Sequence, residues 1–231
     1  GETGNIDGNG DFDPEDPKLI FSLSRRANDF MEAQVKADRP FFLQISHYAD
    51  HLQYRAKPET IEKYETEHAA KATNYQNSPL WAAMNENLDT GVGMVLDKID
   101  ELGIADNTYV IYTGDNGYES KVDHWKPVSE RTFHKAYPLL SHKYMISEGG
   151  LRVPLIVRGP GIQAGTFSQT PVMGYDFFPT VMDIAGNLDQ LPESVEGGWN
   201  SHRRGGGSGR LLLPGARRPG RRARGGCPAC G

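Results

Sequence analysis

Residues 108–117 read TYVIYTGDNG, and this stretch decides the fold that the sequence predicts. Its first six residues are all β-branched or aromatic, which is typical of a buried strand. Gly114 ends that strand, and Asp115 and Asn116 then set a carboxylate beside an amide before Gly117 turns the chain. Oxygen-bearing side chains at the carboxyl end of a buried strand suit a hard divalent cation such as Ca²⁺ or Mg²⁺. An ordinary turn is the alternative, because Asp, Asn and Gly dominate turns for backbone reasons.

The length and composition of the chain set the first bounds. It has 231 residues, of which 37% are hydrophobic, so it is long enough for one domain with a full core or for most of a larger one. No run of about 18 apolar residues occurs, so a membrane-spanning helix is not expected. The chain starts at Gly1 without a basic and then apolar leader. We therefore expect that a targeting segment has been removed or that the start is missing.

The charge of −5 is unevenly distributed. All 30 acidic residues precede Trp199, whereas eight arginines follow it, so the acidic body is not expected to bind nucleic acid. The segment 199–231 resembles either an Arg/Gly-rich RNA-binding tail or a disordered tail. We favour a third interpretation, translation out of frame, because the composition changes abruptly to residues of G/C-rich codons. The two cysteines, Cys227 and Cys230, form a single CxxC pair, which cannot close a four-ligand zinc site.

Helix signals alternate with apolar stretches along the rest of the chain. Apolar spacing, prolines at helix starts and glycines at helix ends predict helices over residues 17–36, 58–72, 78–103 and 176–186. Two further apolar runs, at residues 41–46 and 155–157, predict strands. Helices that alternate with strands favour a parallel sheet covered by helices.

Further polar side chains lie close to the predicted strands. His47 and His51 follow the 41–46 strand in a loop, where a histidine can act as an acid, a base or a ligand. Lys143 and Arg152 precede the 155–157 strand and could bind an anion, although a lone Lys or Arg is more often a surface charge. Three other histidines are predicted to be solvated: His124, His134 and His142.

Several ordered segments together resemble the sulfatase family. Val110 to Gly117 (VIYTGDNG) looks like the family's V-x-F-T-S-D-N-G strand. Lys143 and the segment Glu148 to Pro154 (EGGLRVP) are similar to its K-x4-E-G-G-x-R-V-P motif at the same spacing. Phe41 to His51 (FFLQISHYADH) resembles its F-F-L-x-x-S-x-x-x-x-H segment. Two more segments also match, at residues 96–107 and 170–186.

The resemblance implies an alkaline-phosphatase-like three-layer α/β/α sandwich with a mostly parallel sheet, and the hydrolysis of sulfate esters. Asp115 and Asn116 would bind Ca²⁺, rather than Mg²⁺, and the ion would polarise the sulfate oxygens. Lys143 would stabilise charge on the sulfate and the leaving oxygen. His51 would contact the sulfate or protonate the leaving alcohol. The substrate would be a sulfated small molecule or glycan, met in the periplasm, outside the cell or in a lysosome.

The departures from the family pattern concern the nucleophile above all. The family's Cys/Ser-x-Pro-Ser-Arg motif, whose first residue becomes formylglycine, does not occur in this chain. Phe21 to Arg25 (FSLSR) lacks the proline and lies in the first predicted helix. The early aspartate pair that completes the calcium site is also absent. Asp50 replaces the proline often found before the histidine, which keeps His47 as the alternative to His51.

We therefore interpret the chain as a fragment, without the N-terminal part of its domain and inactive by itself. It would comprise a mobile acidic and Gly-rich loop (1–16), a partial sulfatase catalytic domain (17–198) and the Arg/Gly-rich tail (199–231). Two other functions stay open at this point. One is a phosphate mono- or diester hydrolase of the same superfamily, which would use a threonine or serine nucleophile. The other is a non-catalytic metal-binding or anion-binding module.

Overall fold

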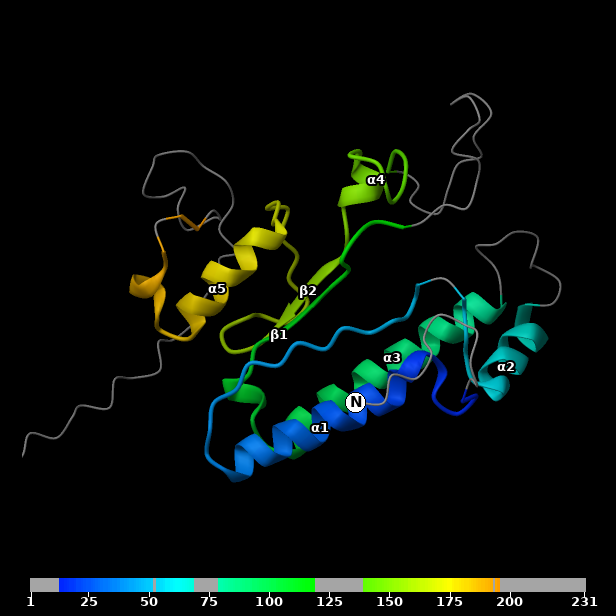
Figure 1. Ribbon diagram of the computed structural model, residues 1–231, viewed down its shortest axis with the longest axis horizontal. Helices are drawn as coiled ribbons and strands as arrows, with labels where there is room; N and C mark the ends of the chain where they lie inside the picture. Colours follow the sequence, from blue (N-terminus) through cyan, green and yellow to red (C-terminus); the bar gives the residue numbers. More distant parts are fainter. Residues whose placement is uncertain (1–12, 52, 69–78, 119–138, 193, 196–231) are drawn as a thin grey trace, which may run out of the picture. The chain divides into compact units, whose positions relative to one another are not determined.

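The computed structural model describes residues 13–51, 53–68, 79–118, 139–192 and 194–195. The elements used below, all drawn in Figure 1, are α1 (Ile20–Lys36), α2 (Pro58–His68), α3 (Pro79–Glu101), β1 (Val110–Thr113), α4 (Glu148–Leu151), β2 (Leu155–Arg158) and α5 (Phe177–Ile184). They belong to two compact units, the first made of Gly1–Ala105 and Gly114–Val153 and the second of Asp106–Thr113 and Pro154–Gly231. The four predicted helices are confirmed, and so are the two strands predicted at residues 108–113 and 155–157, which are β1 and β2.

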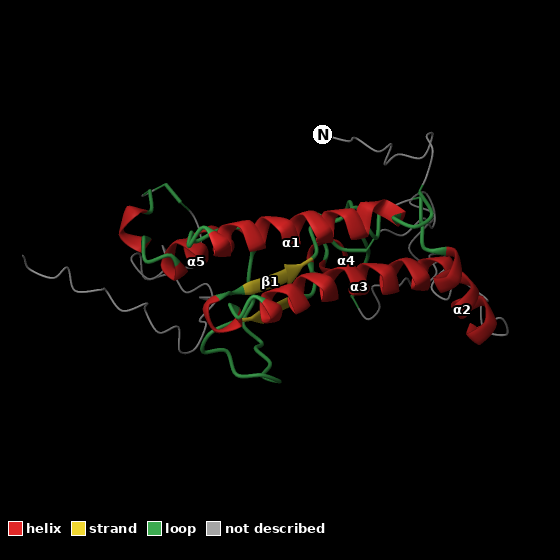
Figure 2. Cartoon of the chain, turned by 90° about the horizontal axis from the view of Figure 1, so that it is seen from below, coloured by secondary structure: helices red, strands yellow, loops and turns green. Residues whose placement is uncertain are grey.

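Helices α1 and α3 lie side by side in the first unit, as Figures 1 and 2 both show. The Asn28 amide donates a hydrogen bond to the Met94 carbonyl at 3.1 Å, and the Lys98 ammonium lies 3.3 Å from the Glu32 carboxylate. Because these contacts advance in the same order along both helices, the helices run in the same direction. The helix α1 buries its apolar face completely at Ile20 and Met31. Full burial of side chains of this size contributes about 1.5–3 kcal/mol each.

Gly91 lets the two helices come close, and Gly93 offers a matched test of this. A Cβ added at Gly91 would lie 2.5 Å from the buried Ile20 Cγ2, whereas one added at Gly93 would meet nothing within 4 Å. We expect Gly91→Ala to lower the free energy of unfolding by about 1–3 kcal/mol through overpacking. Gly93→Ala should raise it by up to about 1 kcal/mol, because alanine favours helix. Urea unfolding of both variants measures the difference, and shifts in the same direction would contradict this packing.

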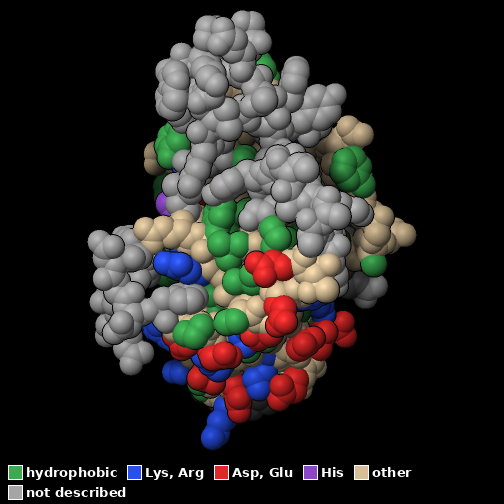
Figure 3. All heavy atoms as spheres, turned by 90° about the vertical axis from the view of Figure 1, so that its right-hand side faces the viewer, with side chains coloured by type: hydrophobic (Ala, Val, Ile, Leu, Met, Phe, Trp, Pro, Cys, Tyr) green, Lys and Arg blue, Asp and Glu red, His purple; other side chains and the backbone are tan. Residues whose placement is uncertain are grey.

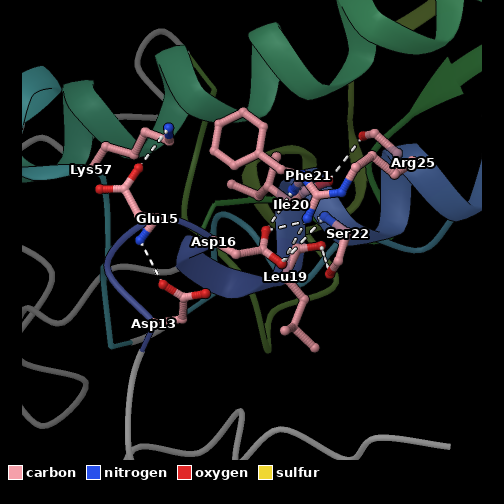
Figure 4. Close-up of polar contacts among 10 residues, drawn as sticks. Asp13, Glu15, Asp16, Leu19, Ile20, Phe21, Ser22, Arg25 and Lys57 are labelled. Atoms are coloured by element: carbon pink, nitrogen blue, oxygen red, sulfur yellow. Dashed lines mark hydrogen bonds and ion pairs between the residues drawn. The ribbon is translucent and has the colours of Figure 1, made fainter.

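The first helix begins three residues later than the sequence predicts, and Asp16 caps it from outside. A 3-10 turn over Pro17–Leu19 precedes α1 and carries left-handed backbone angles. The Asp16 carboxylate then accepts hydrogen bonds from the backbone N–H groups of Phe21 at 2.8 Å and Ser22 at 3.1 Å (Figure 4). The Arg25 guanidinium lies 3.9 Å from the same carboxylate. Asp16 thus satisfies N–H groups of the first turn and places its charge at the positive end of the helix.

Removal of this carboxylate should therefore weaken α1. We expect Asp16→Ala to lower the free energy of unfolding by about 0.5–2 kcal/mol, the usual effect of losing a helix cap. Asp29→Ala is the matched control, because Asp29 is exposed in the middle of the same helix and should change stability by less than about 0.5 kcal/mol. Thermal unfolding followed by circular dichroism compares the two variants. Equal effects would show that Asp16 acts only through its general charge.

A buried amide joins α2 to α3. The Asn87 side chain accepts a hydrogen bond from the Lys57 backbone N–H at 2.8 Å and donates one to the Thr60 hydroxyl at 3.0 Å. Three small or flexible side chains form the apolar cluster beside it, here called the helix cluster: Ala56, Ala83 and Met84. In Figure 3 exposed acidic and basic side chains gather in the lower part of the view, where charges of opposite sign lie near one another. The burial of Asn87 is tolerated because both ends of its amide have partners.

The two described strands form one hydrogen-bonded pair. In the second unit β1 and β2 are antiparallel, from Val110 opposite Arg158 to Thr113 opposite Leu155. The sheet is predicted to be mostly parallel, and this one pair is antiparallel because the chain leaves β1 and re-enters β2 at the same end without crossing over. The β1 residues are also half-buried or exposed rather than buried. Two strands shield each other along one edge only.

The predicted strand over residues 41–46 forms no ladder within the described part of the chain. Its residues alternate between half-buried and exposed, as in a strand. It packs against α1 through Phe41, whose ring meets that of Phe30 edge-on at 5.9 Å. A strand also needs hydrogen bonds to a neighbour, which alternation alone does not supply.

Other predictions have simpler outcomes. Gly103 and Gly186 end α3 and α5 with positive φ angles, as predicted for helix-terminating glycines. The FSLSR segment lies in α1, where Ser24 is fully buried and donates to the Ile20 carbonyl at 2.9 Å. No helix in the described ranges has the length and apolar character needed to cross a membrane. Residues 1–12 of the predicted acidic loop and the whole predicted tail, residues 199–231, lie outside the described residues.

Candidate functional site

Backbone hydrogen bonds tie together the two loops that carry three of the predicted site residues. The Gly117 N–H donates to the Gly150 carbonyl at 2.9 Å, and the Lys143 N–H donates to the Tyr118 carbonyl at 2.8 Å. Both loops belong to the first unit. The turn at residues 115–116 therefore adjoins the segment of Lys143, as expected if the two act on one ligand.

Three glycines make this approach possible. An added Cβ would collide with a main-chain carbonyl oxygen in each case: Gly117 with that of Gly149, Gly149 with that of Ser141 and Gly150 with that of Met145. Main chain rather than side chain blocks each position, so the neighbour could not move aside cheaply. Sequence reasoning missed this packing role, and the adjacent pair of glycines in the EGGLRVP segment was the available signal.

Substitution of one of these glycines should open the loop pair. We expect Gly149→Ala to lower the free energy of unfolding by at least about 2 kcal/mol, because the collision is with backbone. Gly174→Ala is the control, since a Cβ there would meet nothing within 4 Å and should cost less than about 0.5 kcal/mol. Chemical denaturation of the two variants gives the comparison. A Gly149→Ala variant as stable as the control would refute the close packing of the loops.

Asp115 and Asn116 are both exposed at the tip of their turn. The Asn116 amide nitrogen donates to one Asp115 carboxylate oxygen at 2.9 Å, so the two side chains already lie together. Their oxygens fit a hard cation in kind, but Ca²⁺ takes about six to eight oxygen ligands. Within the described ranges, no three His, Cys, Asp or Glu side chains are grouped so that they could hold a metal ion. The pair is therefore suited to contribute part of a calcium site.

The two predicted cations differ in their surroundings. Lys143 is half-buried, and its ammonium lies 5.6 Å from the ring centroid of the exposed Tyr144. Arg152 forms an ion pair with Glu148 at 2.9 Å, with both side chains largely exposed. Arg152 thus fits the surface-charge alternative, whereas the Lys143 backbone is bonded to Tyr118, two residues after Asn116.

His51 lies on a turn that is anchored to α3. The His51 N–H donates to the Tyr48 carbonyl at 3.0 Å, and the Trp81 indole N–H donates to the Asp50 carboxylate at 3.2 Å. Two residues beside the turn pack against the helix cluster: Ala49 and Tyr54. The His51 side chain itself is exposed. Asp50, noted in the sequence only as a departure from proline, therefore holds the turn that presents His51.

His47 and His142 have quite different environments. His47 is half-buried, and its Nδ1 has no hydrogen-bond partner within the described residues. Burial lowers the pKa of His47, so its ring is neutral at pH 7. The prediction that His142 is solvated is wrong, because its side chain is only 3% exposed and its Nδ1 lies 2.6 Å from the Lys143 carbonyl. His124 and His134 lie outside the described residues.

The motifs at these loops agree with a family-wide comparison. The Sulfatase family model matches residues 15–187. The chain belongs to the sulfatase family. A sulfatase of Formosa agariphila is 32% identical over 188 residues, which cover 77% of this sulfatase chain and 32% of that protein. The steryl-sulfatase of Rattus norvegicus is 34% identical over 175 residues, which cover 75% of this chain and 28% of that one.

Solved structures give the same result for the fold. The crystal structure of Ps i-CgsB in complex with k-i-k-neocarrahexaose is similar with a TM-score of 0.63 and 26% identity, over 81% of this chain and 39% of that one. The similarity to sulfatase structures confirms the predicted alkaline-phosphatase-like fold, of which this chain forms a part. This sulfatase chain spans about a third of the length of the curated relatives it matches.

Proposed function

We propose that this chain forms part of the active site of an enzyme that hydrolyses the sulfate ester of a small molecule or glycan. The observation that carries the proposal is the backbone tie between two loops, one with Asp115 and Asn116 and the other with Lys143. A sulfate ester offers anionic oxygens and a leaving oxygen that gains negative charge. Oxygen ligands for a cation, an ammonium group and an imidazole are the groups that such a substrate requires. Membership of the sulfatase family supports the same reaction class.

Each residue has a distinct role in this proposal. Asp115 and Asn116 provide oxygen ligands for Ca²⁺, which when bound supplies Lewis-acid polarisation of the sulfate. Lys143 binds a sulfate oxygen and stabilises the charge that develops on the leaving oxygen. His51 contacts the sulfate or donates a proton to the leaving alcohol. No residue of this chain is assigned as the formylglycine nucleophile, because residues 1–231 contain no Cys/Ser-x-Pro-Ser-Arg segment.

Two observations support His51 over His47 as the active-site histidine. His51 is exposed on an anchored turn, so its ring can meet a substrate. His47 is half-buried, and this burial lowers its pKa, which disfavours the imidazolium form. A group that protonates a leaving alcohol must be able to reach the leaving oxygen, and the exposed His51 meets this requirement better than the half-buried His47.

Substitutions in the full-length protein test these roles. Lys143→Ala should lower kcat on an aryl sulfate by about 10²-fold, as expected on loss of one preorganised stabilising group. His51→Ala should lower kcat by about 10²-fold for alcohols of high pKa and by less for phenols of low pKa, which leave without protonation. Asp115→Ala should lose calcium as well as activity, which metal analysis of the purified protein measures.

Matched controls separate these effects from general damage. Lys36→Ala removes a lysine from the exposed last turn of α1 and should leave kcat unchanged. His47→Ala should reduce kcat by the same factor for every leaving group, if it reduces it at all. If instead the loss of kcat in His47→Ala depended on the pKa of the leaving alcohol and the loss in His51→Ala did not, His47 would be the active-site histidine. If Lys143→Ala retained kcat/KM within about twofold of the wild type, Lys143 would be a surface charge.

A further inference from the structure

His142 makes a short contact with the main chain of its neighbour. Its side chain is 3% exposed, and its Nδ1 lies 2.6 Å from the carbonyl oxygen of Lys143. A carbonyl oxygen can only accept a hydrogen bond, so Nδ1 must carry the proton. A buried histidine with a defined tautomer is therefore built into the loop that carries Lys143.

The contact completes the fixation of the Lys143 backbone. The Lys143 N–H donates to the Tyr118 carbonyl at 2.8 Å, and its carbonyl accepts from His142. The His142 carbonyl in turn accepts from the Met145 N–H at 3.2 Å, which closes the turn. Both peptide groups that flank the Lys143 Cα are thus held, one by the loop of Asp115 and one by His142. The direction in which the Lys143 side chain leaves the backbone is set by these two bonds.

We propose that His142 is a positioning residue for Lys143. Lysine carries its charge on a flexible four-carbon stem, so the place that its ammonium can reach depends on the orientation of its Cα. A displacement of about 1 Å at a reacting group can cost about 10²-fold in rate. The His142 Nδ1–H prevents such a displacement by holding the Lys143 carbonyl. This inference rests on the proposed function of Lys143 in sulfate-ester hydrolysis.

The test is a double-mutant cycle in the full-length protein, assayed on an aryl sulfate. His142→Leu fills a similar volume without a donor and should lower kcat by about 10-fold to 100-fold, with KM within about threefold of the wild type. His142→Asn keeps an N–H near the position of Nδ1 and should recover kcat to within about threefold of the wild type. In the Lys143→Ala background, His142→Leu should lower kcat by less than about twofold, because the group that it positions is gone.

The single variant Lys143→Ala separates the two levels of the proposal. If Lys143→Ala lowers kcat but His142→Leu does not, or if the two effects multiply, His142 is structural only and the proposed function still stands. If Lys143→Ala leaves kcat unchanged, the role of Lys143 falls and the inference about His142 falls with it. Nitrogen NMR of histidine-labelled protein, assigned with His142→Asn, adds a readout independent of activity. A His142 ring protonated at Nε2 alone would overturn the inference even if His142→Leu failed to fold.

Discussion

The candidate site depends on close contact between the main chains of its two loops. Three glycines, Gly117, Gly149 and Gly150, lie so close to a carbonyl oxygen that a β-carbon at any of them would collide with it. Because main chain lies directly against main chain, the two loops close through backbone hydrogen bonds rather than through side chains. Their side chains are left to serve other purposes. Asp115 and Asn116 stand exposed on one loop, and the other loop carries Lys143. Backbone packing thus holds the two loops together, and the polar side chains that they carry are the ones proposed to act on the substrate.

Three buried polar side chains among the described residues form hydrogen bonds with the backbone or with another side chain. Asn87 joins two helices with both ends of its amide satisfied. The Asp16 carboxylate accepts hydrogen bonds from the first N–H groups of α1. His142 is the third, since its buried ring donates to a carbonyl that would otherwise lack this bond. Such contacts add little net stability individually, but leaving one partner unsatisfied is costly.

Local patterns in the sequence predicted the helices well. The apolar spacing of residues 80–102 and the glycine at 103 define α3 without reference to the rest of the chain. Pairing of strands could not be predicted in the same way. The direction of β2 relative to β1 depends on the path of the segment between them, and Phe41–Ser46 alternates like a strand without a ladder in the described structure. Which strands pair depends on segments that are far apart in the sequence, and a local pattern of residues carries no information about them.

The candidate site also combines residues that local motifs predict with residues that only the folded structure reveals. The residues proposed to act on the substrate could be identified from the motifs, because an acid beside an amide and a lysine at fixed spacing are visible in the sequence itself. The supporting residues could not. His142 was predicted to be solvated, because nothing in its sequence neighbourhood reveals the carbonyl that its ring meets. Trp81 lies far along the chain from the Asp50 carboxylate that it holds. Support of this kind arises only when the chain is folded.

The three glycines also determine how this site can be altered by evolution or by design. Where a neighbouring side chain crowds a residue, a second substitution can make room, but a carbonyl oxygen of the main chain has no smaller replacement. Any substitution at Gly117, Gly149 or Gly150 is therefore expected to destabilise the two loops. The exposed Tyr144, beside Lys143, carries no such restriction. If the proposed function holds, substitutions that adapt the site to a different sulfate ester would occur at positions like Tyr144, while the backbone around them stays the same.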